Sequence, residues 1–136
     1  MPRVSAWFVR ASLCHLVAGF LIGALLLAGK GITLGFDAWA LRALRPVHIE
    51  MLLVGWMIQL VMGVAIWIFP RFVLRRAPQR SAVTAWLALA LLNWGVLLVS
   101  LGGSFLAAGR LFEIAAAASF GVHLWGRLSP PGLSGV

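Results

Sequence analysis

The chain has 136 residues, of which 62% are hydrophobic and 10% are charged, and its formal net charge is +8. Soluble domains are about 45–50% apolar and about 25% charged, so this composition excludes a disordered chain and a water-soluble domain with one buried core. The single cysteine, Cys14, excludes a disulfide scaffold. The basic residues flank apolar runs, which is typical of membrane topology and argues against nucleic acid as a partner.

Four apolar stretches each approach the ~20 residues that cross the core of a bilayer. They cover about residues 7–29, 47–69, 82–101 and 105–125. Because backbone polar groups must be satisfied inside lipid, each stretch is predicted to be a helix. The first stretch exceeds the apolar core of a signal peptide and is expected to stay in the mature protein. The sequence therefore predicts an all-α, polytopic membrane protein, a single four-helix transmembrane domain over residues 1–136 with a flexible tail at 129–136.

The basic residues also predict an orientation. Seven of them lie before or near the start of the first span, between the second and third spans, or after the fourth. The other four lie between the first and second spans or near the start of the fourth, on the opposite side. This bias predicts that both termini are cytoplasmic, in the cell (inner) membrane. Gly102-Gly103-Ser104 predicts a tight turn between the last two spans. The longer connection before the second span is expected to hold a short amphipathic helix over residues 37–44, on the outer surface.

Few ionisable groups fall inside the spans, and such groups are functional candidates because burying them in lipid is costly. The histidines and carboxylates among them are His15, His48, Glu50, Glu113 and His123. No nucleophile has a base at a suitable spacing and no phosphate-binding loop is present, so neither a hydrolase nor a transferase is indicated. By helical rise His15 and His48 are ~15–20 Å apart, too far for one metal ion within a subunit. A lone histidine can also have a purely structural role. Glu113 lies three residues after Arg110, a spacing at which two oppositely charged side chains on a helix can pair.

Glycines share helix faces with two of these histidines. His48 shares a face with Gly55 and Gly63, and His15 shares one with Gly19 and Gly23. A histidine on the same helix face as glycines could bind the metal of a planar macrocycle, and the glycines would leave a flat surface for the ring. Close packing of helices is the alternative interpretation of such glycines.

The segment 44–71, LRPVHIEMLLVGWMIQLVMGVAIWIFPR, resembles helix II of the catalytic subunit of haem-copper oxidases, most closely C-type cytochrome oxidases and nitric oxide reductases. The resemblance implies that His48 is an axial ligand of haem b and that Arg42 and Arg45 hold the haem propionates. Glu50 stands where C-type oxidases carry a small polar residue. The whole chain resembles the first four helices of that subunit, whose second haem ligand and active-site ligands lie on later helices. The chain has no tyrosine, so the family's cross-linked tyrosine has no counterpart.

These observations predict a membrane haem b protein, of oxidoreductase type, that transfers electrons or binds O2 or NO near the outer membrane face. Homo-oligomers usually close by rotational symmetry, so a homotrimer, or alternatively a dimer, is expected to complete the site. An electron donor or a respiratory complex is the expected partner. The candidate site residues are Arg42, Arg45, Glu50 and Gly55 for the cofactor, and His15, His48 and His123 for the metal.

Three alternatives remain open from the sequence. The first is a haem-free accessory or assembly subunit of a respiratory oxidase complex. The second is a copper-handling protein that uses His48, Met51 and Met62, although Met62 is ~21 Å from His48 by helical rise. The third is a proton relay along the groups His15, Gln59, Glu113 and His123.

Overall fold

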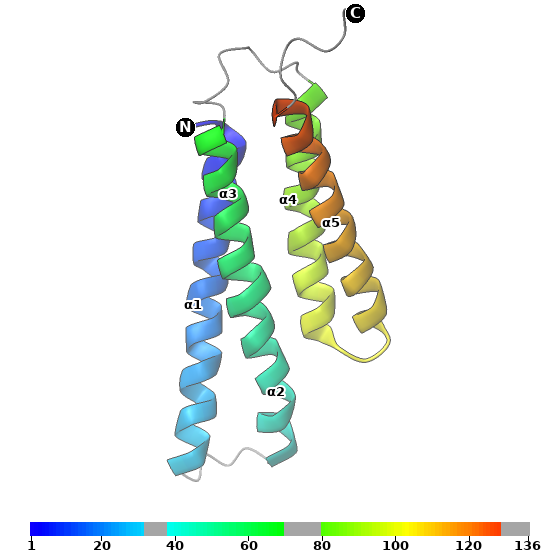
Figure 1. Ribbon diagram of the computed structural model, residues 1–136. Coiled ribbons are helices and arrows are strands. Elements are labelled where there is room, and N and C mark those ends of the chain that lie inside the picture. The colour runs from blue at the N-terminus through cyan, green and yellow to red at the C-terminus, as the bar shows by residue number, and fades with distance from the viewer. Residues whose placement is uncertain (32–37, 70–79, 129–136) are drawn as a thin grey trace, which may run out of the picture.

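The computed structural model describes residues 1–31, 38–69 and 80–128, and the regular structure within these ranges is entirely helical (Figure 1). The elements are α1 (Arg3–Gly31), α2 (Ala38–Glu50), the π-helix η1 (Met51–Ile58), α3 (Gln59–Ile68), α4 (Arg80–Leu101) and α5 (Phe105–Leu128). Since α2, η1 and α3 follow one another without a gap, they form one long helix with a π-helical middle. The predicted tail at 129–136 lies outside the described residues.

Among the described residues, four helices are long and apolar enough to cross a membrane, as many as the sequence predicts, although the first two begin earlier than predicted. They are Arg3–Lys30, Leu41–Ile68, Ala82–Leu101 and Phe105–Trp125. Exposed apolar side chains line these helices, for example Phe20 at 63% and Leu111 at 67% of their full accessibility. Such exposure suits lipid, because acyl chains are as apolar as the side chains that face them. The chain therefore has the helices of a multi-pass membrane protein.

The short helix expected at 37–44 is not separate from the second span. Its described part, from Ala38 onward, is the start of α2 and runs on through Pro46 into η1. A proline inside a helix removes one backbone hydrogen bond, yet here the helix continues on both sides of it. The sequence has no glycine between residues 38 and 54, so Pro46 is the only strong helix breaker in this stretch and it does not end the helix.

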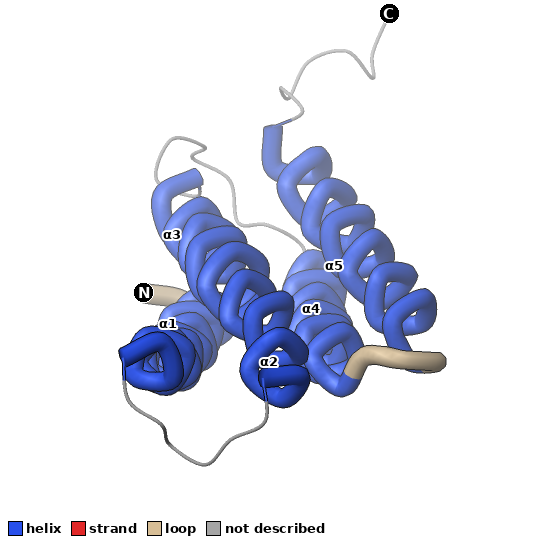
Figure 2. Tube along the Cα trace, turned by 90° about the horizontal axis from the view of Figure 1, so that it is seen from below, coloured by secondary structure: helices blue, strands red, loops and turns tan. Residues whose placement is uncertain are grey.

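The helices form two antiparallel hairpins (Figure 1). In the first, α1 packs along α2, η1 and α3, and in the second α4 packs along α5. The α4–α5 turn uses Gly102 and Gly103 at φ +70° and +56°, a backbone region that glycine enters without steric cost. The predicted tight turn is thus confirmed. Figure 2 shows α4 between the first hairpin and α5.

The two ends of the bundle differ in character. The N-terminal end comprises the start of α1, the end of α3, the start of α4 and the end of α5; the turn end is the opposite one. The apolar core lies toward the N-terminal end and consists of Val4, Phe8, Met62, Ile66, Ala85, Ala88, Leu92 and Ala116. Gly63 lets α1 and α3 approach closely there, since a Cβ atom on it would lie 2.7 Å from Cβ of Phe8.

Candidate functional site

His48 on α2 is held against α1 near the turn end. Its Nδ1 lies 2.8 Å from the carbonyl oxygen of Gly19. The ring rests on Gly23, where a Cβ atom would lie 2.6 Å from Cε1 of His48. A carbonyl only accepts, so Nδ1 donates this hydrogen bond, and in the neutral ring Nε2 keeps its lone pair. Metal-binding imidazoles are commonly held in this way, with one nitrogen donating to a backbone carbonyl.

His15 on α1 packs against a glycine of the partner helix, just as His48 packs against a glycine of α1. Its ring packs on Gly55 of η1, where a Cβ atom would lie 2.7 Å from Cγ of His15. Gly55 is seven residues from His48, so the two histidines stand ~10 Å apart along the helices, less than the ~15–20 Å expected from the sequence. That distance still exceeds what one metal ion spans, because metal–nitrogen bonds are ~2 Å long. The flat surface predicted at Gly55 is therefore covered by a side chain of the same chain.

His123 lies at the opposite end of the bundle from His48. It is 2% exposed on α5, and its Nδ1 is 3.2 Å from Oγ1 of Thr84 on α4. Across residues 1–31, 38–69 and 80–128, no three His, Cys, Asp or Glu side chains gather closely enough to hold a metal ion. The three histidines predicted as metal ligands thus occupy three separate places within one chain.

The two arginines predicted to hold propionates lie on α2 before His48. Arg42 and Arg45 are both exposed, and Arg45 precedes His48 by one helical turn. The α4–α5 hairpin turns back before the end of the first hairpin, so this part of α2 projects beyond it (Figure 1). The arginines are therefore accessible to a ligand or to a second protein chain.

A guanidinium with two carboxylates joins the two hairpins toward the turn end. Arg110 on α5 forms a two-pronged ion pair with Glu50 on α2: Nη2 is 2.7 Å from Oε2, and Nη1 is 3.2 Å from Oε1. Nη1 also lies 2.6 Å from Oε2 of Glu113, which confirms the ion pair expected at that spacing. Gly95 on α4 makes room for Glu113, since a Cβ atom there would lie 2.7 Å from its Cγ. We call Glu50, Arg110 and Glu113 the ionic triad.

Sequence reasoning missed the partner of Glu50, because 60 residues separate it from Arg110. One signal was available. Glu50 and Arg110 carry opposite charges and both lie in the half of their spans toward the turn end. Charged side chains inside a membrane usually pair with one another. A search for residues of opposite charge at similar depth in the membrane would therefore have identified this pair.

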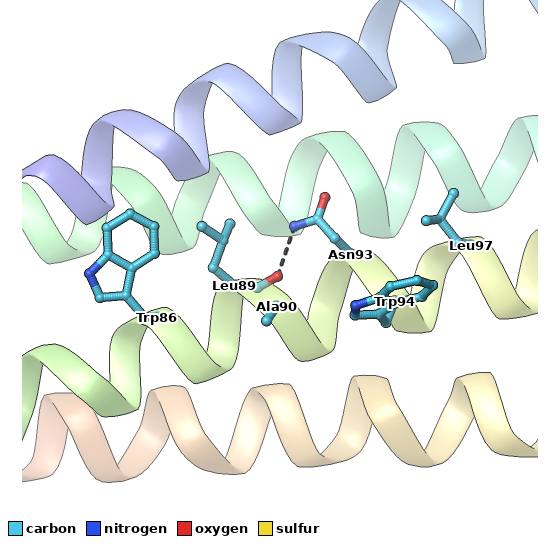
Figure 3. Close-up of a pocket in the computed structure, with 6 residues that line it drawn as sticks. All are labelled: Trp86, Leu89, Ala90, Asn93, Trp94 and Leu97. Atoms are coloured by element: carbon cyan, nitrogen blue, oxygen red, sulfur yellow. Dashed lines mark hydrogen bonds between the residues drawn. The ribbon is translucent and has the colours of Figure 1, made fainter.

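A shallow groove runs along α4, lined by Trp86, Leu89, Ala90, Asn93, Trp94 and Leu97 (Figure 3). The side-chain nitrogen of Asn93 donates to the carbonyl oxygen of Leu89, 2.8 Å away in the same helix. Trp94 is 60% exposed beside it. The groove therefore combines an amide with exposed aromatic rings, midway along a helix that can span a membrane.

No family model, curated protein or solved structure matches the chain. The fold and the site define an all-helical chain, over the ranges the structure describes, with four helices that can span a membrane. Two arrangements in it can do chemistry: the oriented imidazole of His48 and the ionic triad. The likeness to haem-copper oxidases stays a hypothesis that depends on the residues of segment 44–71.

Proposed function

We propose that the chain is a membrane protein that binds haem b through Nε2 of His48, for electron transfer or for binding a diatomic gas. The observation that carries the proposal is the contact between Nδ1 of His48 and the carbonyl oxygen of Gly19. This contact fixes the ring and leaves Nε2 in the form that binds a metal. In this proposal both termini are cytoplasmic, so that His48 lies near the outer face of the inner membrane.

The described residues around His48 provide partners for the haem propionates but no second ligand for the iron. Exposed guanidinium groups suit carboxylates because two parallel N–H donors match two oxygens, and Arg42 and Arg45 provide such groups. A bound haem supplies iron that changes its oxidation state and can take a gas as ligand. Within one described chain, His15 is turned onto Gly55 and His123 lies at the other end. A second protein ligand is therefore assigned to another copy, in a homotrimer or alternatively a dimer.

The test of the haem site is the absorbance and iron content of the purified protein in detergent. We expect a Soret band and bound iron for the wild type, and loss of both in His48→Ala. His15→Ala is the matched control and should keep them. If properly folded wild-type protein supplied with haem shows no Soret band, or if His48→Ala keeps all its haem, the proposal is wrong.

A second variant tests the orientation of His48 without removing it. Gly23→Leu places a side chain where the ring of His48 now lies, so we expect haem to be lost. Gly121→Leu is the matched control, because nothing lies within 4 Å of a Cβ atom there. Equal haem content in the two variants would show that the packing of His48 on α1 does not matter for binding.

The oligomer is tested by the mass of the haem-loaded protein. A trimer or a dimer whose haem is lost on dissociation would support a shared site. A monomer with full haem occupancy would contradict it. An electron donor or a larger respiratory complex remains the proposed partner in either assembly.

The groove on α4 favours one alternative function, a haem-free accessory or assembly subunit of a respiratory complex. An amide side chain on an exposed face of a membrane helix can hydrogen-bond across a helix interface, which suits Asn93 as a docking residue. This alternative predicts colourless protein that co-purifies with an oxidase complex, with weaker co-purification in Asn93→Leu than in Gly121→Leu. The copper alternative is weaker, because Met62 lies in the apolar core and not beside His48.

A further inference from the structure

The ionic triad holds an uneven set of charges. One guanidinium faces two carboxyl groups, so the triad carries a net charge of −1 when all three groups are ionised. Glu50 is 4% exposed, and the side chain of Glu113 is 12% exposed. Two like charges that share a site of low polarity rarely ionise together, because their repulsion adds to the cost of leaving water. The geometry therefore favours one added proton.

The hydrogen bonds indicate which carboxyl group takes that proton. Both oxygens of Glu50 accept from Arg110, as suits an ionised carboxylate. Glu113 uses only Oε2 for Arg110, and its Oε1 is buried without a hydrogen-bond partner among the described residues. A buried oxygen that accepts no hydrogen bond is a poor place for negative charge. Oε1 of Glu113 is thus the favoured position for the proton.

Among the described residues, Arg110 is the one cation that faces Glu113. The described groups that face it are Glu50 from α2, Arg110 from its own helix, and the backbone at Gly95 and Gly109 from the α4–α5 contact. The guanidinium side chain of Arg110 is 48% exposed, so the triad reaches the surface of the described chain there.

We propose that Glu113 is a proton-binding site within the membrane-spanning part of the protein. At neutral pH it carries one proton, while Glu50 and Arg110 remain an ion pair. Release converts the carboxylic acid of Glu113 to a carboxylate plus one proton and changes the triad from neutral to −1. Such a site can balance the arrival or loss of a nearby charge by binding or releasing a proton. The proposal does not depend on haem.

The composition of the chain makes this site easy to measure. The sequence contains three acidic residues, Asp37, Glu50 and Glu113, and two of them belong to the triad. Infrared spectroscopy of the full chain in lipid bilayers at pH 7 can therefore count protonated carboxyl groups with little overlap. We expect one protonated carboxyl group in the wild type, and the same signal in the control Asp37→Asn.

Two conservative variants test whether the protonated carboxyl group belongs to the ionic triad. Glu113→Gln keeps an oxygen for Arg110 and should lose the signal completely. Glu50→Gln should lose it too, because Arg110 then balances Glu113 alone and the proton is no longer needed. A wild type without the signal, or a signal that survives in either variant, would overturn the proposal. Haem content measured on the same samples separates this outcome from any failure at His48.

Discussion

The two ends of the bundle are held together by different means. At the N-terminal end, Phe8, Ile66 and Ala85 are fully buried in an apolar core, and the close approach of α1 and α3 depends on Gly63. Toward the turn end, the two hairpins are joined by charges, in the ion pair between Glu50 and Arg110. In lipid there is no hydrophobic drive between helices, so close packing and polar contacts must do this work.

The difference predicts two kinds of sensitivity. At an apolar contact between small residues, the loss of stability grows with the number of atoms that no longer pack, because the energy comes from many weak contacts. At an ionic contact, removing one partner causes a large loss of stability in a single step, because the remaining charge stays buried without a counter-charge. Substitutions at the two ends therefore separate the two mechanisms.

The largest effect is expected from Arg110→Gln. This change leaves the buried carboxyl group of Glu50 beside Glu113 without a cation. Breaking a fully buried ion pair costs about 3–5 kcal/mol, which is an upper bound here because the side chain of Arg110 is 48% exposed. We expect a large drop in the free energy of unfolding, measured by tryptophan fluorescence during denaturation in mixed micelles. Arg42→Gln, at an exposed position on α2, is the matched control and should change little.

A double variant sharpens this result. Glu50→Gln combined with Arg110→Gln removes both charges of the pair and leaves groups that can still hydrogen-bond. Replacing both members of a buried ion pair is often nearly neutral, so we expect most of the lost stability to return. If Arg110→Gln unfolds like the wild type, the ionic triad does not hold the hairpins together.

An intermediate effect is expected from Gly109→Ala within the second hairpin. A Cβ atom on Gly109 would lie 2.7 Å from the backbone nitrogen of Val99 and 2.9 Å from the carbonyl oxygen of Gly95. Backbone atoms cannot turn aside, so α4 and α5 must separate, and overpacking of this kind costs about 1–3 kcal/mol. Gly121→Ala on the same helix has open space around it and should be neutral. Equal stability of the two variants would show that α4 and α5 do not pack this closely.

The sequence predicts those parts of the fold that depend on local signals. Hydropathy over about 20 residues is enough to locate a membrane-spanning helix, so the four spans were predictable. Gly102 and Gly103 predict the turn, and the three-residue spacing predicts the pair of Arg110 with Glu113. Each of these signals lies within a single short segment.

The parts that were not predicted depend on how helices meet. The shared faces of His48 and the glycines were visible in the sequence, but not that the ring of His48 would lie on Gly23 while His15 covers Gly55. The pairing of Glu50 with Arg110 crosses 60 residues and two hairpins. The π-helix after Glu50 was not predicted either, since its hydrogen-bond pattern leaves no clear trace in residue type.

The smallest effect is expected at the N-terminal end, from Ser5→Ala. The hydroxyl of Ser5 donates to the carbonyl oxygen of Gly63 across the α1–α3 contact, at 2.6 Å. Hydrogen bonds between membrane helices contribute about 0.6 kcal/mol on average, so only a small loss of stability is expected. Ser12→Ala is the control, because Ser12 is equally buried but donates to Val9 in its own helix. A difference between the two serine variants as large as the effect of Arg110→Gln would mean that polar contacts, and not apolar packing, hold the N-terminal end together as well.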